Sequence, residues 1–187
     1  MSKIAWIGLG VMGFPMAGHL KARGGHDVVV FNRTRATADA WVGQFGGRLA
    51  GTPAEAAEGA AFVFTCVGND DDLRAVTLRR NGAFEALGKG AIFVDHTTAS
   101  ARIARELHAA ATGRGASALD APVSGGQSGA ENGTLSVMVG GDEEAFRKAA
   151  PAISAYARAV NLIGPTGSGQ LTKMVNQICI GDRKSVV

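Results

Sequence analysis

Three glycines near the amino terminus have the spacing of a nucleotide-binding loop. The segment reads Gly8-Leu9-Gly10-Val11-Met12-Gly13, and it follows an apolar run and opens a stretch with helical periodicity. In this context the G-x-G-x-x-G pattern is informative. We expect Gly8 to allow a tight turn, Gly10 to let the backbone approach a pyrophosphate, and Gly13 to let helix and strand pack closely. The N–H groups at the start of the helix would bind the phosphates, so the loop predicts a dinucleotide site.

The end of the second apolar run bears on which dinucleotide binds. NAD-binding loops usually place Asp or Glu about 20 residues after the glycines, where the carboxylate bonds the ribose 2′-hydroxyl. This chain has Asn32-Arg33-Thr34 there, with no carboxylate. Arg33 can pair with a 2′-phosphate, and Thr34 adds a hydroxyl donor. The sequence therefore favours NADP and leaves NAD open, and the alternative for Arg33 is a solvated surface side chain.

Two later strand ends are expected to flank the same crevice, because ligands bind at the carboxyl ends of parallel strands. The first carries Cys66 and Val67, followed by three aspartates at 70–72, and the second carries His96 and Thr98. Three aspartates resemble a metal site, but acidic residues at a helix start are more typical of capping and of a favourable helix dipole. We interpret His96 as structural, and no metal is predicted.

Two further segments carry groups that suit a small carboxylate substrate and proton transfer. Ser124-Gly125-Gly126 offers a hydroxyl and unshielded backbone N–H groups, which suit a carboxylate as well as they suit an ordinary turn. Lys173, Asn176 and Gln177 are spaced to share one face of a helix. A lysine there can act as a general acid or base if its surroundings tune its pKa, but an isolated helix lysine is usually solvated.

The elements that must position these residues alternate along the chain. Continuous apolar runs predict strands at 4–8, 27–31, 48–50, 61–67, 91–95, 116–120, 135–139 and 159–162. Helical spacing predicts helices at 12–22, 36–45, 53–58, 70–77, 100–112, 143–156 and 170–180. Apolar strands alternating with helices predict an α/β fold of the Rossmann type, a doubly wound and mostly parallel sheet covered on both faces.

The chain is expected to divide into three parts. Residues 1–163 form the predicted NADP-binding Rossmann domain, and 164–181 form a linker and the start of an interdomain helix. That helix has an apolar stripe that needs a partner, so a following helical domain is expected to be missing. Residues 182–187 break the stripe, and we interpret them as a non-native tail that resembles translated adapter sequence.

Composition excludes several classes of protein. The net charge is +3 and the pI about 9.1, but Lys and Arg are dispersed, so nucleic-acid binding is not predicted. Cys66 and Cys179 lie too far apart for a disulfide framework or a zinc cluster. No apolar stretch approaches the roughly 20 residues of a membrane span, and no signal peptide is recognised. A reduced, cytoplasmic setting is expected.

Four motifs taken together resemble the β-hydroxyacid dehydrogenase family, which includes 3-hydroxyisobutyrate dehydrogenase and 2-hydroxy-3-oxopropionate reductase. In chain order they are residues 7–13, 120–126, 167–173, and the pair Lys173 and Asn176. The stretch 66–73 also resembles the cofactor loop of that family. The resemblance covers almost all of residues 2–180, and four ordered motifs are more specific than one glycine loop.

The resemblance implies roles for individual residues. Lys173 would be the general acid in reduction and the general base in oxidation, and Asn176 would hold the reacting oxygen with help from Gln177. Ser124, Gly125 and Gly126 would bind the substrate carboxylate, and Val67 and Thr98 would contact the cofactor. Residues 8–13, 32–34 and Cys66 complete the expected cofactor site.

The resemblance also implies a longer protein. Family members carry an all-helical domain that closes the active site and builds much of a homo-oligomer. The present chain is therefore expected to be truncated and to bind cofactor more readily than it turns over substrate. An imine or short-aldehyde reductase on the same scaffold, or a non-catalytic dinucleotide-binding fragment, are the alternatives.

Overall fold

The computed structural model describes residues 2–183, with side chains described up to Cys179. Its strands are β1 (Lys3–Ile7), β2 (Asp27–Phe31), β3 (Arg48–Leu49), β4 (Phe62–Thr65), β5 (Ile92–Asp95), β6 (Ser117–Asp120), β7 (Val123–Ser124), β8 (Leu135–Gly140) and β9 (Ala157–Gly164). The helices are α1 (Gly13–Ala22), α2 (Arg35–Phe45), α3 (Pro53–Ala57), α4 (Asp70–Thr77), α5 (Ala101–Thr112), α6 (Gly126–Asn132), α7 (Glu143–Ile153) and α8 (Ser168–Arg183), with a 3-10 turn at Ala83–Glu85.

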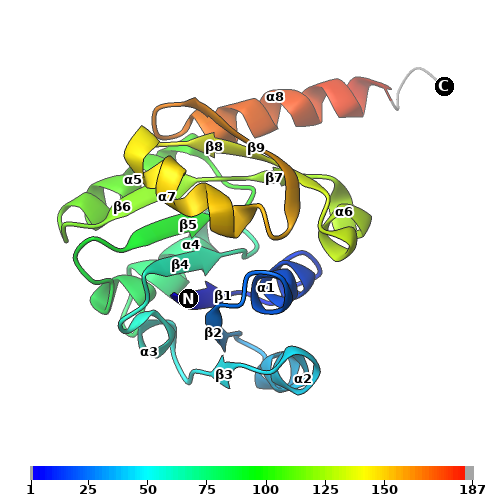
Figure 1. The fold of residues 1–187 in the computed structure, drawn as a ribbon. Helices are drawn as coiled ribbons and strands as arrows, with labels where there is room; N and C mark the ends of the chain where they lie inside the picture. Colours follow the sequence, from blue (N-terminus) through cyan, green and yellow to red (C-terminus); the bar gives the residue numbers. More distant parts are fainter. Residues whose placement is uncertain (1, 184–187) are drawn as a thin grey trace.

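These strands form a single sheet within the described residues (Figure 1). Its order is β3-β2-β1-β4-β5-β6-β8-β7, with β9 paired to β8. The strands from β3 to β6 are parallel, whereas β8 runs antiparallel to β6 and to β7. The order 3-2-1-4-5-6 is that of the Rossmann fold, and its switch point lies between β1 and β4. The predicted fold class is confirmed.

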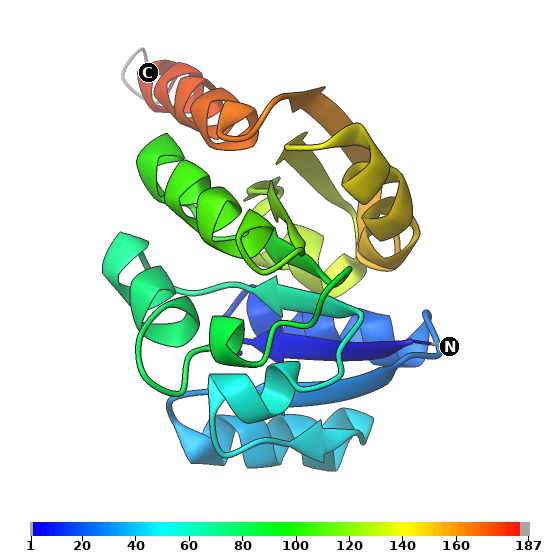
Figure 2. The same cartoon turned by 90° about the vertical axis from the view of Figure 1, so that its left-hand side faces the viewer.

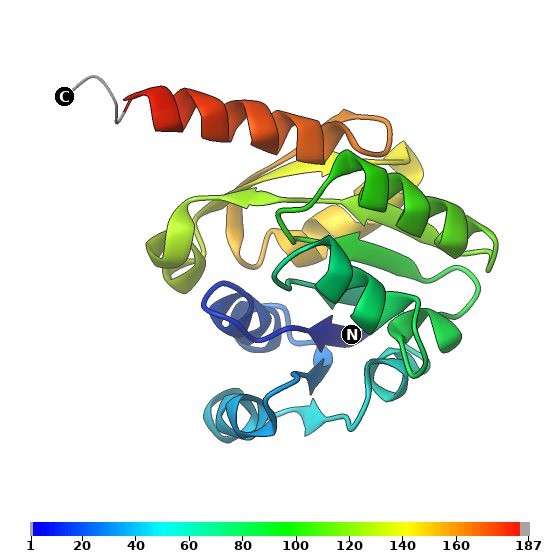
Figure 3. The ribbon, with the colours of Figure 1, turned by 180° about the vertical axis from the view of Figure 1, so that it is seen from behind.

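Helices cover both faces of the sheet, as the continuous apolar strands predicted. On one face, α1 and α2 pack over residues of β1 and β2 such as Trp6 and Val30, and α7 packs over β5 and β6. On the other face, α3, α4 and α5 pack against Ala5, Val29 and Phe93. Figures 2 and 3 show the second group of helices together on their side of the sheet. Strands β1, β2, β4, β5 and β6 therefore bury both faces, which is why their sequences show no polar alternation. The outer strand β9 has exposed positions along its length.

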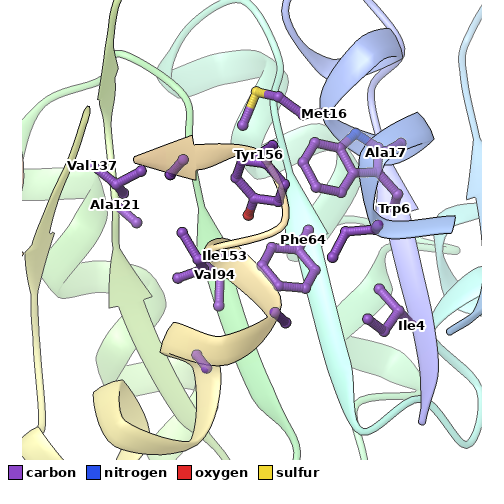
Figure 4. Close-up of a cluster of buried hydrophobic side chains, with 14 of the residues drawn as sticks. Ile4, Trp6, Met16, Ala17, Phe64, Val94, Ala121, Val137, Ile153 and Tyr156 are labelled. Carbon is purple, nitrogen blue, oxygen red and sulfur yellow. The ribbon is translucent and has the colours of Figure 1, made fainter. Parts of the chain in front are cut away.

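Aromatic rings fill the first of these two cores behind the glycine loop. Trp6 stacks on Phe64 with ring centroids 5.4 Å apart, and Tyr156 meets Trp6 edge-on at 5.8 Å (Figure 4). The indole Nε1 of Trp6 donates a hydrogen bond of 2.9 Å to the carbonyl oxygen of Gly8. This hydrogen bond links the packed core directly to the glycine loop.

Strand β7, helix α6 and the 3-10 turn at Ala83–Glu85 were not predicted. The segment 123–133 is short and holds four glycines, which lower helix propensity. The helix predicted at 143–156 ends at Ile153, and the last strand extends beyond 159–162 to Ala157 and Gly164. The strand thus ends one residue past the predicted domain boundary.

Helix α8 begins two residues before its predicted start, and its far half extends past the sheet (Figures 1 and 3). Leu171, Met174, Val175 and Ile178 are 45–66% exposed, so the apolar stripe is uncovered here. The helix includes Asp182 and Arg183, and the rest of the predicted tail, 184–187, lies outside the described residues. Between residues 2 and 183 no helix is both long and apolar enough to span a bilayer.

Candidate functional site

The glycine loop has the geometry that its spacing requires. Gly8 has φ +97°, and a Cβ at this position would collide with the carbonyl oxygen of Cys66, just past the end of β4. A Cβ at Gly13 would collide with the carbonyl oxygen of Gly8, so only glycine lets α1 approach β1 this closely. A Cβ at Gly10 would meet nothing within 4 Å. The backbone at Gly10 therefore faces open space, where a ligand can approach it.

A cavity of about 510 Å³ opens beside this loop. It lies at the carboxyl ends of β1, β2 and β4, where the Rossmann order reverses. Ten predicted cofactor residues line it: Gly8, Gly10, Val11, Met12, Gly13, Asn32, Arg33, Thr34, Cys66 and Val67. Lining residues that were not predicted as site residues include Phe31, Pro53, Gly68, Asp72, Ala75 and Val76.

Two predicted cofactor residues lie apart from this cavity. The Leu9 side chain is buried and borders a second hollow of about 640 Å³ between α1, α2 and α6. Only the backbone of Leu9 takes part in the loop, since its N–H donates to Asn32 Oδ1 at 2.9 Å. Thr98 is exposed, just past the end of β5.

The polar residues at the end of β2 differ in what they can offer a ligand. Asn32 is already engaged, because its Oδ1 accepts from Leu9 and its Nδ2 donates to the carbonyl oxygen of Thr34 at 3.0 Å. It therefore ties the glycine loop to the end of β2. Arg33 is largely exposed, and its Nη1 lies 3.3 Å from Asp72 Oδ1. The hydroxyl of Thr34 makes no capping bond to α2 and is available.

The three aspartates that resembled a metal site lie at the start of α4. Asn69 caps this helix through hydrogen bonds of 2.9 Å from the amides of residues 71 and 72. The carboxylates diverge, because Asp70 accepts from Ser100, Asp71 faces Arg74 and Asp72 faces Arg33. The aspartates occupy the first turn of the helix, as the dipole interpretation predicted, but the prediction that they cap it is wrong, since the capping residue is Asn69.

His96 is a core residue, as its interpretation as structural predicted. Its Nδ1 lies 2.6 Å from the carbonyl oxygen of Ala121 and must donate, so Nε2 accepts from the Tyr156 hydroxyl at 2.7 Å. Burial lowers the pKa of His96 to about 4, although the bond to Ala121 opposes the shift. The imidazole is neutral and fully engaged, which leaves it no proton to transfer near neutral pH.

Asp95 is a second buried ionisable group, and it was not predicted as a site residue. Its Oδ1 accepts hydrogen bonds from the Thr65 hydroxyl at 2.8 Å and the Thr97 amide at 2.9 Å, while Oδ2 has no partner. Burial raises the pKa of Asp95 to about 7, against the pull of those hydrogen bonds. The hydroxyl of Thr97 in turn accepts from the amide of Val67 at 3.0 Å. Asp95 therefore orders the loops that carry Val67 and Thr98.

Burial also decides the state of Cys66. Its partly buried side chain, with the charge of Asp95 nearby, has a thiol pKa raised to about 12. A thiol this weakly acidic stays protonated and is a poor nucleophile. Cys66 can therefore line the cavity but is not suited to covalent chemistry.

Helix α8 is held to the sheet by two residues that sequence reasoning missed. Asp120 accepts backbone hydrogen bonds from Gly167 at 2.7 Å and Gln170 at 2.9 Å, at the first turn of the helix. The buried side chain of Gln170 donates to the carbonyl oxygen of Thr97 at 2.7 Å and accepts from the amide of Ala99 at 3.0 Å. The signal in the sequence was an aspartate ending a strand and a glutamine beginning an amphipathic helix.

The predicted substrate-binding residues contact the helix that carries the predicted catalytic residues. Asn176 Nδ2 lies 3.5 Å from the Ser124 hydroxyl at the end of β7. Gly125 and Gly126 follow with φ of +136° and +62°, and a Cβ at Gly126 would meet nothing within 4 Å. Lys173 is three residues from both Gln170 and Asn176, so it belongs to the face of α8 turned towards these contacts.

Partial burial of Lys173 lowers the pKa of its ammonium group. The direction suits a proton donor and acceptor, because an amine with a pKa nearer neutrality exchanges its proton more readily. Gln177 is exposed. Of the four predicted polar groups at this end, the structure joins Ser124 to Asn176 directly and sets Lys173 one turn away on the same helix.

Comparison with known proteins identifies the family. The family described as the NAD binding domain of 6-phosphogluconate dehydrogenase matches residues 3–164. An uncharacterised oxidoreductase of Shewanella frigidimarina is 62% identical over 180 residues, which cover 96% of this chain and 62% of that protein. A probable 3-hydroxyisobutyrate dehydrogenase-like protein of Arabidopsis thaliana is 43% identical, with coverage of 96% and 53%.

Two further comparisons agree with these. The 2-hydroxy-3-oxopropionate reductase of Escherichia coli is 37% identical, with coverage of 95% and 60%. The solved Mycobacterium tuberculosis 3-hydroxyisobutyrate dehydrogenase with L-serine has a TM-score of 0.90 and 35% identity, covering 96% of this chain and 60% of that one. The chain thus spans about six tenths of the length of its relatives. It belongs to the family of the NAD-binding domain of 6-phosphogluconate dehydrogenase, with relatives that carry both of the enzyme names suggested by its motifs.

Proposed function

We propose that this chain is the cofactor-binding part of an oxidoreductase that transfers a hydride between NADP(H) and a small β-hydroxy acid or its semialdehyde. The proposal rests on the relative position of the cavity and helix α8. The glycine-loop cavity and the Lys173–Asn176 face of α8 belong to one end of the sheet, and Gln170 fastens that helix to the loop bearing Thr98. A dinucleotide site and a proton donor are thereby held on a single rigid frame.

The residues around the cavity fit a dinucleotide. The open backbone at Gly10, with the start of α1 that no side chain caps, suits the pyrophosphate. Arg33 and Thr34 offer a cation and a hydroxyl for the 2′-phosphate, which favours NADP(H), while NAD(H) remains the alternative. Val67 and Thr98 lie at strand ends beyond the loop, towards α8, where the nicotinamide half belongs. When bound, the cofactor supplies or accepts the hydride at C4 of its nicotinamide.

The substrate's carboxylate is assigned to residues 124–126. Ser124 has a hydroxyl within reach of Asn176, and the backbone at Gly126 borders open space. A carboxylate bound there would lie beside the amide of Asn176 and the amine of Lys173. A small hydroxy acid fits this arrangement because its carboxylate and reacting hydroxyl are only a few bonds apart.

Lys173 is proposed to move the proton of the substrate hydroxyl. In reduction its ammonium group donates to the developing alkoxide, and in oxidation the neutral amine accepts the hydroxyl proton. Partial burial, which lowers the pKa of Lys173, makes both states accessible. Asn176 is proposed to hold the reacting oxygen by hydrogen bonding, with Gln177 beside it.

The wider setting is also a proposal. Both cysteines are free, which suits a reduced cytoplasmic compartment. The uncovered stripe on α8 suits a helical partner, as in a longer homo-oligomeric protein. The small carboxylate is the proposed partner, rather than nucleic acid or membrane.

Titration with NADPH and NADH tests the cofactor step on the 187-residue chain itself. Trp6 supports the glycine loop, so energy transfer from tryptophan to the bound nicotinamide reports binding. Saturable binding of NADPH, tighter than that of NADH, is expected. The absence of binding at high micromolar concentrations of either nucleotide would refute the proposal. Turnover is tested by joining residues 1–180 to the remaining part of the Shewanella frigidimarina relative and assaying small hydroxy acids, semialdehydes and imines.

A further inference from the structure

The corner proposed for the 2′-phosphate holds a carboxylate that the end of β2 lacks. Asp72, on the first turn of α4, lines the cavity together with Arg33. Arg33 Nη1 lies 3.3 Å from Asp72 Oδ1, and the two side chains are 89% and 31% exposed. The acidic group usually supplied by the second strand is thus brought to the site from the opposite side.

The two members of this ion pair are not equally fixed. The amide of Asp72 donates to Asn69 Oδ1 at 2.9 Å within the capped helix start. Its Oδ2 lies close over Gly68, where an added Cβ would come within 2.6 Å of it. Arg33, by contrast, is almost fully exposed. A ligand that draws Arg33 away therefore leaves the Asp72 carboxylate in place at the cavity wall.

The difference between a fixed Asp72 and an exposed Arg33 affects whether NADP(H) or NAD(H) binds better. An exposed ion pair is weak, so a phosphate can displace it, but the remaining carboxylate repels the phosphate's negative charge. A ribose 2′-hydroxyl meets no such repulsion and can donate a hydrogen bond to a carboxylate. A repulsive group placed against one of two competing ligands is a common source of specificity.

We propose that Asp72 is a specificity-determining residue that opposes the 2′-phosphate of NADP(H) and favours the 2′-hydroxyl of NAD(H). The inference rests on the proposed dinucleotide site and deepens it. Arg33 and Asp72 then act against each other, and the preference of the chain is the difference between the two effects. The reading of Arg33 alone overstates the preference for NADP(H).

The neighbouring residue provides a matched control. Asp71 carries the same charge on the same helical turn, but it is 87% exposed, pairs with Arg74 and does not line the cavity. Asp71→Asn and Asp72→Asn therefore change the net charge and the helix start equally. Only the second substitution changes the corner next to Arg33.

The test compares dissociation constants for NADPH and NADH, measured by tryptophan energy transfer on the full 187-residue chain. Asp72→Asn is expected to tighten NADPH binding about tenfold, which corresponds to about 1.4 kcal/mol, and to leave NADH binding within about twofold. Asp71→Asn is expected to change both constants by less than about twofold. In an Arg33→Gln background the gain from Asp72→Asn should persist, since the repulsion between the carboxylate and the phosphate does not depend on the arginine.

The outcomes separate the two proposals. If wild type binds both nucleotides and Asp72→Asn leaves their ratio unchanged, the inference fails and the dinucleotide site stands. Equal gains from Asp71→Asn and Asp72→Asn would also overturn it, since the effect would then be general charge. Failure of every variant to bind either nucleotide would overturn the inference together with the proposed function, provided circular dichroism shows folded chains.

Discussion

The side-chain amide of Gln170 donates a hydrogen bond of 2.7 Å to the carbonyl oxygen of Thr97. This bond joins the helix that carries Lys173 to the loop that carries Thr98, two segments more than 70 residues apart in the sequence. The same side chain accepts a hydrogen bond from the amide of Ala99, so both its oxygen and its nitrogen bond to the loop. The proposed proton donor and the proposed cofactor loop are therefore held in one fixed relation.

Gln170→Ala is expected to destabilise the chain by about 1–3 kcal/mol, because the buried amide of Ala99 and the carbonyl of Thr97 lose their partners. Urea unfolding followed by circular dichroism measures the change. Gln177→Ala, on an exposed position of the same helix, is the control and should fall within about 0.5 kcal/mol of wild type. Equal losses in the two variants would show that the hydrogen bonds of Gln170 contribute nothing to stability.

Two glycine substitutions should have opposite effects. At Gly13 a methyl group would strike the carbonyl oxygen of Gly8, so Gly13→Ala is expected to weaken NADPH binding at least tenfold and to destabilise the fold. Gly43 lies exposed within α2, with open space around its Cα, so Gly43→Ala should stabilise the chain by roughly 0.5–1 kcal/mol. Thermal unfolding and nucleotide titration check both. Unchanged binding in Gly13→Ala would contradict the role given to the loop.

The buried pair Asp95 and His96 predicts an unusual pH dependence of stability. Burial raises the pKa of Asp95 from 3.8 to about 7, so its contribution is present below pH 3.8 and is lost as the pH rises to 7. Burial lowers the pKa of His96 from 6.5 to about 4, so its contribution is present above pH 6.5 and is lost as the pH falls to 4. Between these limits the two slopes oppose each other.

Asp95→Asn removes the pH dependence that Asp95 contributes to stability and keeps the one that His96 contributes. Between pH 6.5 and 4 the free energy of unfolding of this variant is expected to fall by about 1.4 kcal/mol per pH unit relative to wild type. Urea midpoints measured at intervals of half a pH unit give the comparison. Parallel curves for the two chains would show that Asp95 ionises normally in the folded state.

Lys173→Ala tests the proposed acid–base role in the joined protein. The rate constant kcat is expected to fall by about 10²–10⁴, the usual contribution of a positioned acid or base, with the NADPH dissociation constant nearly unchanged. In the unmodified enzyme, oxidation should rise with pH and level off below the ordinary lysine range, because burial lowers the pKa of Lys173. Lys148→Ala, at an exposed ion pair with Glu144, is the control and should leave kcat unchanged. Full activity in Lys173→Ala would exclude this lysine.

Sequence patterns were sufficient for the fold because they report burial. The strand at 27–31 and the helix at 70–77 were predicted with their exact bounds, since one is a valine run and the other begins with three aspartates, which favour a helix start. Helix α6 was missed because its glycines carry no apolar period. Gln170, Asp95 and Asp72 were missed as site residues because their partners are 71, 30 and 39 residues away, which no local pattern can reveal.

A crystal structure of the chain grown with NADP⁺ would show whether the glycine-loop cavity is the dinucleotide site. The pyrophosphate is predicted to lie against the amides at the start of α1, with the adenosine half in the cavity lined by residues 31–34 and the 2′-phosphate beside Arg33. Arg33 should have turned away from Asp72. A dinucleotide bound elsewhere, or an empty cavity with the Arg33–Asp72 pair intact at saturating NADP⁺, would contradict the assignment of hydride chemistry to this end of the sheet.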